Sequence, residues 1–201
     1  MLTVGLTGPS GAGKGVVASL FARYGVPSID TDAVYHDLLV PPSACLDELV
    51  ARFGESVLTA DGRLDRKALA AVVFAAGHEN DLLDLNRITH RHVLDEARRQ
   101  LTAYKAQGKA AVLVDAPQLY ESGFDTECDY VVAVLAPRDV RLSRIVARDE
   151  LDEARAAARM DAQKDDDFFR QHADVILMND GEIHALDVQI QAMLRCWEVL
   201  S

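Results

Sequence analysis

An α/β fold with a parallel sheet is the class that the sequence predicts, and three stretches support it. The segment "LTVGLT" (2–7) is a short apolar run with β-branched residues, typical of a buried strand. A glycine-rich turn, "GPSGAGKG" (8–15), follows, and "KGVVASLFARYG" (14–25) then has the apolar spacing of a helix. After residue 108 the alternation of strand and helix patterns returns. Strands separated by helices favour a parallel sheet with helices on its faces.

The other elements follow in chain order. The segment "VPSID" (26–30) predicts a second strand that ends in acidic residues. Residues 33–107 have mostly helical patterns, so we expect a helical insertion between a core of 1–32 and 108–201. The later apolar runs predict strands within 110–117, 129–137 and 173–181. The segments that follow the last two of these strands predict helices within 138–164 and 182–200.

Composition limits the function classes. The chain has 201 residues, 49% of them hydrophobic, which suits one packed domain with a small insertion. A formal charge of −11 disfavours binding to nucleic acid or acidic membranes. We find no membrane-length apolar run and no secretion signal, and therefore expect a cytoplasmic protein. We also expect a monomer or weak homo-oligomer. Three scattered cysteines, Cys45, Cys128 and Cys196, are expected to be reduced thiols.

The glycine-rich turn matches the phosphate-loop pattern G-x-x-x-x-G-K at Gly8, Gly13 and Lys14. In this arrangement backbone N–H groups surround the β-phosphate of a nucleotide, and the lysine bridges the β- and γ-phosphates. The strand before the loop and the helix after it predict a P-loop NTPase-type three-layer fold that binds a nucleotide. The pattern normally continues with a hydroxyl residue that holds Mg²⁺, but Gly15 and Val16 stand there.

Aspartates end two of the predicted strands. Asp30 and Asp32 follow the second strand, at the sheet edge where a phosphate loop also lies. A carboxylate at this edge can accept a proton from an attacking hydroxyl or hold Mg²⁺ through water. One of the two could instead cap a helix starting at Ala33. Asp115 ends the next strand, either as a second metal-side carboxylate or as a cap of the following turn.

Six arginines concentrate positive charge in one segment. Four of them recur at intervals of three, three and four residues, within about one third of a helix circumference. Arginine suits a clamp on phosphate oxygens. We expect salt bridges with the nearby Asp139, Asp149, Glu150 and Glu153 to account for only one or two of the six. The six are Arg138, Arg141, Arg144, Arg148, Arg155 and Arg159.

The histidines at 90 and 92 lie in a helical pattern. Two residues apart on a helix, they point away from each other, which disfavours a metal pair. His90 aligns with the apolar residues Val93, Ala97 and Leu101, so we expect it to face inward, either packed or against a substrate.

With these motifs together, the chain resembles the dephospho-coenzyme A kinases over nearly its whole length. The phosphate loop alone is shared with many enzymes, whereas the ordered set is specific. The matching stretches are "VGLTGPSGAGKG", "VPSIDTDAVYHDLL", "DGRLDRKALAAVVF", the "ITH" that ends at His90, "APQLYESGFD", "RLSRIVARD", "ARMDAQ" and "HADVILMNDG".

The resemblance implies transfer of the γ-phosphate of ATP, with Mg²⁺, to the ribose 3′-hydroxyl of dephospho-coenzyme A. It also implies a helical acceptor-binding domain and a mobile lid at about 150–165, which would exclude water. The resemblance implies three catalytic residues: Asp32 as the base, Lys14, and Arg144, which would stabilise the transferring phosphate. ATP would be bound by Gly8, Gly11, Ala12, Gly13, Lys14, Gly15, Val16, Arg148, Arg159 and Gln163, and the acceptor by Asp32, Arg66, His90 and Glu121.

Departures from the family pattern leave alternatives open. Family loops usually read G-K-S-T, so Gly15 and Val16 alter the metal shell; we expect Asp32 or Asp115 to hold Mg²⁺ through water. Gln118 and Arg91 also differ from the family pattern, and these differences concern the binding of the acceptor. The loop also resembles that of cytidylate kinases, which makes a nucleoside monophosphate kinase the nearest rival. The other alternative is a non-catalytic protein that binds ATP or coenzyme A.

Overall fold

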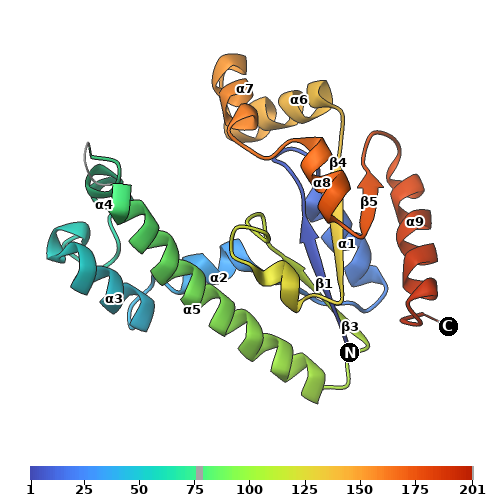
Figure 1. The fold of residues 1–201 in the computed structure, drawn as a ribbon, viewed down its shortest axis with the longest axis horizontal. Helices are drawn as coiled ribbons and strands as arrows, with labels where there is room; N and C mark the ends of the chain where they lie inside the picture. Colours follow the sequence, from blue (N-terminus) through green and yellow to red (C-terminus); the bar gives the residue numbers. More distant parts are fainter. Residues whose placement is uncertain (76–78, 201) are drawn as a thin grey trace. The chain divides into compact units, whose positions relative to one another are not determined.

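The computed structural model describes residues 1–75 and 79–200, which form two compact units (Figure 1). The first, here called the core unit, contains Met1–Ile29 and Ala103–Ser201. The second, called the helical unit, contains Asp30–Thr102. Among the described residues, no helix is both long enough and apolar enough to span a membrane.

A five-stranded sheet with the order β2-β3-β1-β4-β5 organises the core unit. The central pairings β1–β3, β1–β4 and β4–β5 are all parallel, which confirms the predicted fold class. Strands β3 and β4 are nearly continuous apolar runs because both of their faces are covered. The strands are β1 (Leu2–Thr7), β2 (Ser28–Asp30), β3 (Ala111–Asp115), β4 (Tyr130–Leu135) and β5 (Val175–Met178).

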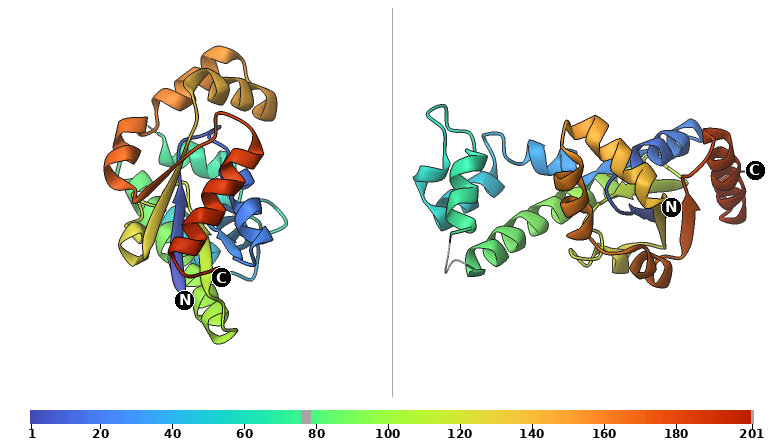
Figure 2. Two further views of the ribbon diagram at one scale, coloured as in Figure 1. Left: turned by 90° about the vertical axis from the view of Figure 1, so that its right-hand side faces the viewer. Right: turned by 90° about the horizontal axis from the view of Figure 1, so that it is seen from above.

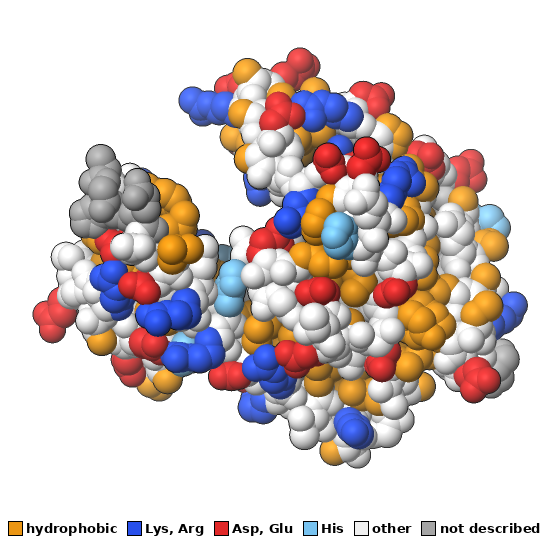
Figure 3. Space-filling model, viewed as in Figure 1, with side chains coloured by type: hydrophobic (Ala, Val, Ile, Leu, Met, Phe, Trp, Pro, Cys, Tyr) orange, Lys and Arg blue, Asp and Glu red, His pale blue; other side chains and the backbone are white. Residues whose placement is uncertain are grey.

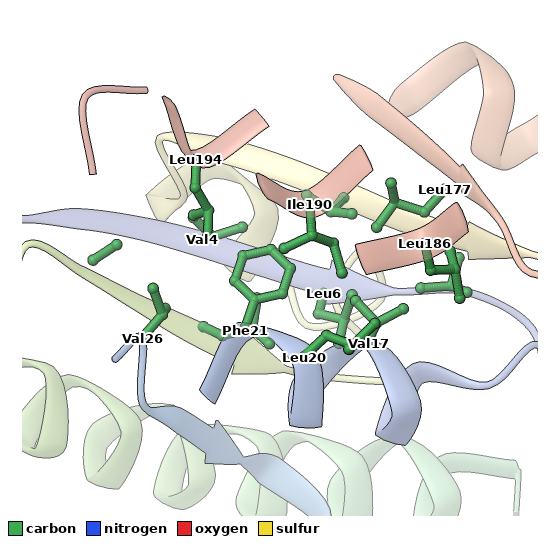
Figure 4. Packing of buried hydrophobic residues seen from close by; sticks show 14 of the residues in the cluster. Val4, Leu6, Val17, Leu20, Phe21, Val26, Leu177, Leu186, Ile190 and Leu194 are labelled. Atoms are coloured by element: carbon green, nitrogen blue, oxygen red, sulfur yellow. The ribbon is translucent and has the colours of Figure 1, made fainter. Parts of the chain in front are cut away.

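Helices pack against both faces of this sheet. Alternate residues of β4 point to opposite faces. On one face Val132 and Val134 join the hydrophobic cluster formed with α1 (Lys14–Arg23) and α9 (Ile183–Cys196). Figure 4 shows Phe21 of α1 and Ile190 of α9 meeting over the sheet. Burying each such side chain contributes roughly 1.5–3 kcal/mol.

The opposite face is covered by α8 (Asp166–His172), as the left view of Figure 2 shows. Phe169 of this helix packs against Ala133 and Leu135 of β4. The 3₁₀ turn η2 (Phe124–Glu127) follows β3, contains the buried Phe124 and lies against β1, the central strand. The sheet is therefore the middle layer of three.

The arginine-rich segment forms two helices rather than one, α6 (Arg138–Asp149) and α7 (Glu153–Asp161). Glu150 has the left-handed conformation that ends α6, with φ 53°. Asp152 then starts α7 as its N-cap, accepting a hydrogen bond from the backbone N–H of Arg155. Figure 3 shows basic and acidic side chains next to one another over these two helices.

The helical unit has a hydrophobic cluster of its own. Cys45, Leu49 and Phe53 of α3 pack with Leu69 of α4 and Ile88 of α5 in this cluster. Residues 76–78 of the predicted helical insertion lie outside the described residues. The elements are α2 (Thr31–Asp37), α3 (Ala44–Phe53), η1 (Glu55–Val57), α4 (Arg66–Val73) and α5 (Glu79–Ala106), whose last residues belong to the core unit.

Candidate active site

The loop between β1 and α1 is a backbone cradle that only glycine can form at two positions. Gly8 and Gly13 have φ values of 137° and 97°, in the region that L side chains rarely adopt. A Cβ at Gly8 would lie 2.2 Å from the carbonyl oxygen of Val134, and one at Gly13 would lie 2.1 Å from Nδ2 of Asn179. Because these glycines carry no side chains of their own, the loop backbone suits the close approach of a phosphate group.

The start of α1 adds positive potential to this loop. Lys14 is the first residue of the helix, and its Nζ lies 3.2 Å from the carbonyl oxygen of Gly8, so the side chain folds back over the loop. Gly13 is the N-cap and provides no side-chain hydrogen bond, and the first turn contains no acidic residue. The partial positive charge of the helix N-terminus therefore remains available to an anion. These features fit the β- and γ-phosphates of a nucleotide.

Arg144 of α6 reaches the loop from the side. Its Nη1 lies 3.2 Å from the carbonyl oxygen of Gly11 and 3.4 Å from that of Ala12. Its Nη2 donates to the carbonyl oxygen of Asn179 at 3.3 Å. The guanidinium group is therefore held against the phosphate cradle within the core unit.

The six arginines pair with carboxylates beyond the four expected ones: Arg148 and Arg159 pair with the expected Asp149, and three others pair with aspartates outside the expected set. Five of them form ion pairs with aspartates, and Arg144 is the exception that binds carbonyl oxygens. The pairs are Arg138–Asp161, Arg141–Asp166, Arg148–Asp149, Arg155–Asp152 and Arg159–Asp149. The spacing along one helix did not reveal that α7 and the start of α8 bring aspartates of their own beside α6.

Asp149 joins two arginines that the family resemblance assigns to ATP. Nε and Nη2 of Arg148 donate to its two carboxylate oxygens at 2.7 and 2.9 Å. Nη1 of Arg159, from α7, donates to Oδ2 at 2.7 Å. The hydrogen bonds from Arg148 are the main reason why the pKa of Asp149 lies below its ordinary value. The carboxylate therefore stays ionised and holds the two guanidinium groups close together.

Gln163, which follows α7, contacts the phosphate loop directly. Its Oε1 accepts a hydrogen bond of 2.9 Å from the backbone N–H of Ser10. The segment between α7 and α8 is thereby attached to the same loop that Arg144 supports. Sequence spacing alone could not show this contact, since the two residues are 153 positions apart.

Asp115 stands at the carboxyl end of β3, at the base of the loop. The strand register places it opposite Leu6 of β1, two residues before Gly8. Its carboxylate oxygens are hard ligands of the kind that Mg²⁺ accepts, directly or through water. Gly15, where the hydroxyl is missing, has no atom within 4 Å of an added Cβ. Within residues 1–75 and 79–200, no group of three or more His, Cys, Asp or Glu could hold a metal by itself.

Asp30 and Asp32 have different environments. Oδ1 of Asp30 accepts hydrogen bonds from the backbone N–H groups of Asp32 at 2.9 Å and Ala33 at 3.0 Å, so Asp30 caps α2. The helix therefore starts at Thr31, earlier than the expected Ala33. Asp32 lies in the first turn and is exposed. Of the two carboxylates, Asp30 is committed to the backbone of the helix that carries Asp32.

The residues expected to bind the acceptor belong to both units. Arg66 begins α4 in the helical unit, and its Nη2 contacts Nδ1 of His36. His90 is partly buried in α5 of the same unit. Glu121 belongs to the core unit, where its Oε1 lies 3.6 Å from Nζ of Lys164.

His36 is a residue that sequence reasoning missed. It lies four residues after Asp32 on α2, so both side chains project from the same side of that helix. Its contact with Arg66 ties α2 to the start of α4. The i,i+4 spacing from Asp32 was the signal that could have identified it.

Comparison with known proteins identifies the family. A model of dephospho-CoA kinase matches residues 2–185. The chain belongs to the dephospho-CoA kinase family. The dephospho-CoA kinase of Corynebacterium efficiens is 37% identical over 201 residues, covering 100% of this chain and 98% of that protein. The chain is therefore a kinase, as expected from the motifs.

Solved structures support the same fold. A Thermus thermophilus protein superimposes with a TM-score of 0.78 at 30% identity, covering 96% of each chain. A dephospho-CoA kinase from Campylobacter jejuni gives a TM-score of 0.70 at 24% identity, again covering 96% of each chain. At this identity the second match supports the fold alone.

One departure from the dephospho-CoA kinase pattern has a structural explanation. Arg91, one of the residues that depart from the family pattern, pairs through its Nη2 with the carboxylate of Glu48 on α3. His92 also contacts Glu48, with 2.9 Å between Nε2 and Oε2. The hydrogen bond with His92, followed by the charge of Arg91, holds the pKa of Glu48 below its ordinary value. Arg91 thus links α5 to α3 inside the helical unit.

Asn179 is a second residue that sequence reasoning missed. It directly follows β5 and is only 5% exposed, and its Nδ2 donates to the carbonyl oxygen of Ala12 at 2.8 Å. The sequence contained one signal for it. A polar residue near the carboxyl end of the predicted strand 173–181 lies at the same sheet edge as the phosphate loop of a dephospho-CoA kinase.

Proposed function

We propose that this chain transfers the γ-phosphate of ATP to the ribose 3′-hydroxyl of dephospho-coenzyme A, giving coenzyme A and ADP. The observation that carries the proposal is the convergence of Lys14, the bare backbone of Gly8–Gly13 and Arg144 on one loop of the core unit. A kinase needs donors directed at the phosphate that moves, and these groups provide them. Family membership supplies the identity of the acceptor.

On the ATP side, the backbone N–H groups of residues 11–16 would bind the phosphates. Lys14 would lie between the β- and γ-phosphates, and Arg144 would stabilise negative charge on the group being transferred. Arg148 would bind ATP, and Arg159 and Gln163 would form part of a lid at about 150–165. Two observations support these roles. Arg148 and Arg159 share the carboxylate of Asp149, and Gln163 accepts a hydrogen bond from the backbone N–H of Ser10. A lid of this kind would exclude water, the competing acceptor.

On the acceptor side, Asp32 would accept the proton of the 3′-hydroxyl as it attacks. This role is supported by Asp30, which caps α2 and leaves the carboxylate of Asp32 exposed. Arg66 and His90, both in the helical unit, would bind the acceptor together with Glu121 of the core unit. Residues 33–107 would then be the acceptor-binding insertion, and 1–32 with 108–201 the nucleotide-binding core.

Mg²⁺ would be held through water by Asp115 or Asp32, since Gly15 and Val16 offer no hydroxyl. When bound, the ion would neutralise charge on the β- and γ-phosphates. The chain's own residues would still bind and orient both substrates. The net charge of −11 supports the absence of a nucleic-acid partner, and we propose a cytoplasmic monomer or weak homo-oligomer, which size-exclusion chromatography with light scattering would test.

A coupled ADP-release assay with several acceptors tests the function. With ATP and increasing Mg²⁺, we expect dephospho-coenzyme A to be phosphorylated, with ³¹P NMR locating the new group on the 3′ oxygen. CMP or another nucleoside monophosphate that reacts far faster would instead identify a nucleoside monophosphate kinase. Binding of ATP without turnover, even at high Mg²⁺, would identify a non-catalytic binding protein.

A further inference from the structure

Asn179 is attached to the phosphate loop by contacts from both its side chain and its backbone. Its own backbone N–H donates to the carbonyl oxygen of Leu135 at 2.7 Å, which continues the pairing of β5 with β4 by one residue. This hydrogen bond fixes residue 179 at the carboxyl edge of the sheet. The side chain is buried and points to the loop, where Nδ2 donates to Ala12.

The peptide between Ala12 and Gly13 is oriented by these donors. Its carbonyl oxygen accepts from Nδ2 of Asn179 at 2.8 Å and from Nη1 of Arg144 at 3.4 Å. In a trans peptide the C=O and N–H bonds point in opposite directions. Holding the carbonyl oxygen of Ala12 on one side of the loop therefore turns the N–H of Gly13 to the other side, away from Asn179.

Asn179 also positions Arg144. The backbone carbonyl oxygen of Asn179 accepts from Nη2 of the guanidinium, while Nη1 binds Gly11 and Ala12. The loop, the arginine and the end of β5 thus form one hydrogen-bonded group. The 2.1 Å between Nδ2 and an added Cβ at Gly13 shows how closely the amide packs under the loop.

We propose that Asn179 is a positioning residue for phosphoryl transfer, acting through the Ala12–Gly13 peptide and through Arg144. It does not bind the acceptor. Its loss should weaken ATP binding because the loop N–H groups lose their fixed direction, and should lower kcat because Arg144 loses alignment. The part of this inference that concerns kcat rests on the proposed function, whereas the part that concerns ATP binding does not.

The test compares Asn179→Asp and Asn179→Ser with Asp180→Asn, a matched change at the next, exposed position. Asparagine and aspartate have the same shape, but the ionised carboxylate cannot donate to Ala12 and repels its carbonyl oxygen. Serine adds no charge and is too short to reach Ala12. We expect both Asn179 variants to raise the Kd of ATP, measured by calorimetry without acceptor, about 10-fold, as one lost buried hydrogen bond predicts.

The kinetic readout separates positioning from a structural role. In both Asn179 variants we expect kcat to fall while the KM of dephospho-coenzyme A changes less than about twofold. Asp180→Asn should match the unchanged protein in Kd, kcat and KM. Thermal unfolding shows which variants are folded. If Asn179→Asp does not fold, the Kd and kcat of Asn179→Ser decide the test.

Folded Asn179 variants with normal ATP affinity and kcat, and only a lower Tm, would overturn the proposal. A loss in Asn179→Asp alone would also overturn it, because the added charge would then explain the effect. If the unchanged protein binds ATP but does not phosphorylate dephospho-coenzyme A, the proposed function fails, and the ATP affinities still test Asn179.

Discussion

The carboxylate of Asp30 accepts a hydrogen bond of 2.9 Å from the backbone N–H of Asp32, two residues further along the chain. The same oxygen accepts from Ala33, so Asp30 satisfies two of the N–H groups that the first turn of α2 leaves without helical partners. The backbone N–H of Asp32 is capped in this turn, but its carboxylate is not the group that caps the helix. Two aspartates of one short motif thus have separate roles in the local structure.

This separation predicts opposite results for the two aspartates. Asp32→Asn should lower kcat by about 10² to 10⁴, the usual contribution of a general base, with Tm and ATP affinity nearly unchanged. Asp30→Ala should lower the free energy of unfolding by about 1 kcal/mol, because the N-cap is lost. Steady-state kinetics and chemical denaturation measure these effects.

Asp30→Asn is the matched control, since asparagine caps helices about as well as aspartate. It should keep both stability and most of the turnover. A collapse of kcat in Asp30→Asn together with normal kcat in Asp32→Asn would show that the base is Asp30 and not Asp32.

Gly15→Ser should restore a metal ligand. An added Cβ at Gly15 meets no atom within 4 Å and the residue lies in α1, so the side chain can be accommodated. We expect the Mg²⁺ concentration for half-maximal rate to fall on the order of 10- to 100-fold, by analogy with other supporting groups of metal sites. Rates measured over a Mg²⁺ series provide the comparison.

Gly15→Ala controls for helix stability in this experiment. Alanine improves the helix propensity of position 15 at least as much as serine but adds no hydroxyl. If the two variants change the Mg²⁺ requirement equally, the hydroxyl is not what the loop lacks.

Gly13→Ala should abolish ATP binding rather than merely destabilise the chain. Its Cβ would require both the strained φ of 97° and the position now occupied by the amide of Asn179. Gly25→Ala is the matched control, with φ 76° but open space around the added Cβ. It should cost roughly 1–2 kcal/mol of backbone strain and leave ATP affinity unchanged. Equal losses of ATP affinity in calorimetry would contradict the cradle geometry.

Two cysteines predict a loss of stability at alkaline pH. Burial raises the pKa of the Cys128 thiol to about 12 and that of Cys45 to about 11. In the unfolded chain a thiol loses its proton near pH 8.5, so unfolding releases protons above this pH. The contribution of these thiols to stability is therefore complete below about pH 8.5 and is lost as pH rises toward 11 to 12.

Thermal unfolding between pH 7 and 11 tests this effect. The decrease of Tm above pH 9 should be shallower in Cys128→Ala and Cys45→Ala than in the unchanged protein. Cys196→Ala, at an exposed position, is the control and should not alter the slope. Identical slopes in all variants would mean that other groups cause the alkaline loss.

Much of the fold could be predicted because its signals are local. A strand of apolar residues, a turn of glycines and a helix with a lysine at its start depend on contacts within a few positions. The predicted strands therefore agree with β1–β5 to within a few residues at each end. A helix cap could be predicted for one of the two aspartates for the same reason, although only the hydrogen bonds of the structure show that the cap is Asp30 and not Asp32.

The partners of the arginines could not be predicted. Their spacing on α6 correctly placed several guanidinium groups along one part of a helix. It could not show that Arg138 pairs with Asp161 and Arg141 with Asp166, because these aspartates come from elements that fold back onto α6. Charge repulsion and attraction depend on distance in space, which sequence separation does not measure.

By itself, then, the sequence determined the parallel α/β class, the phosphate loop and the family-specific motifs. All of these depend on residues that are close together in the chain. The tertiary structure decided which side chains support that loop. Asn179 lies 167 positions from Ala12, and Arg144 lies 133 from Gly11, yet both reach the loop. The physical reason is the strand order β1-β4-β5, which brings the carboxyl ends of distant strands to one edge of the sheet.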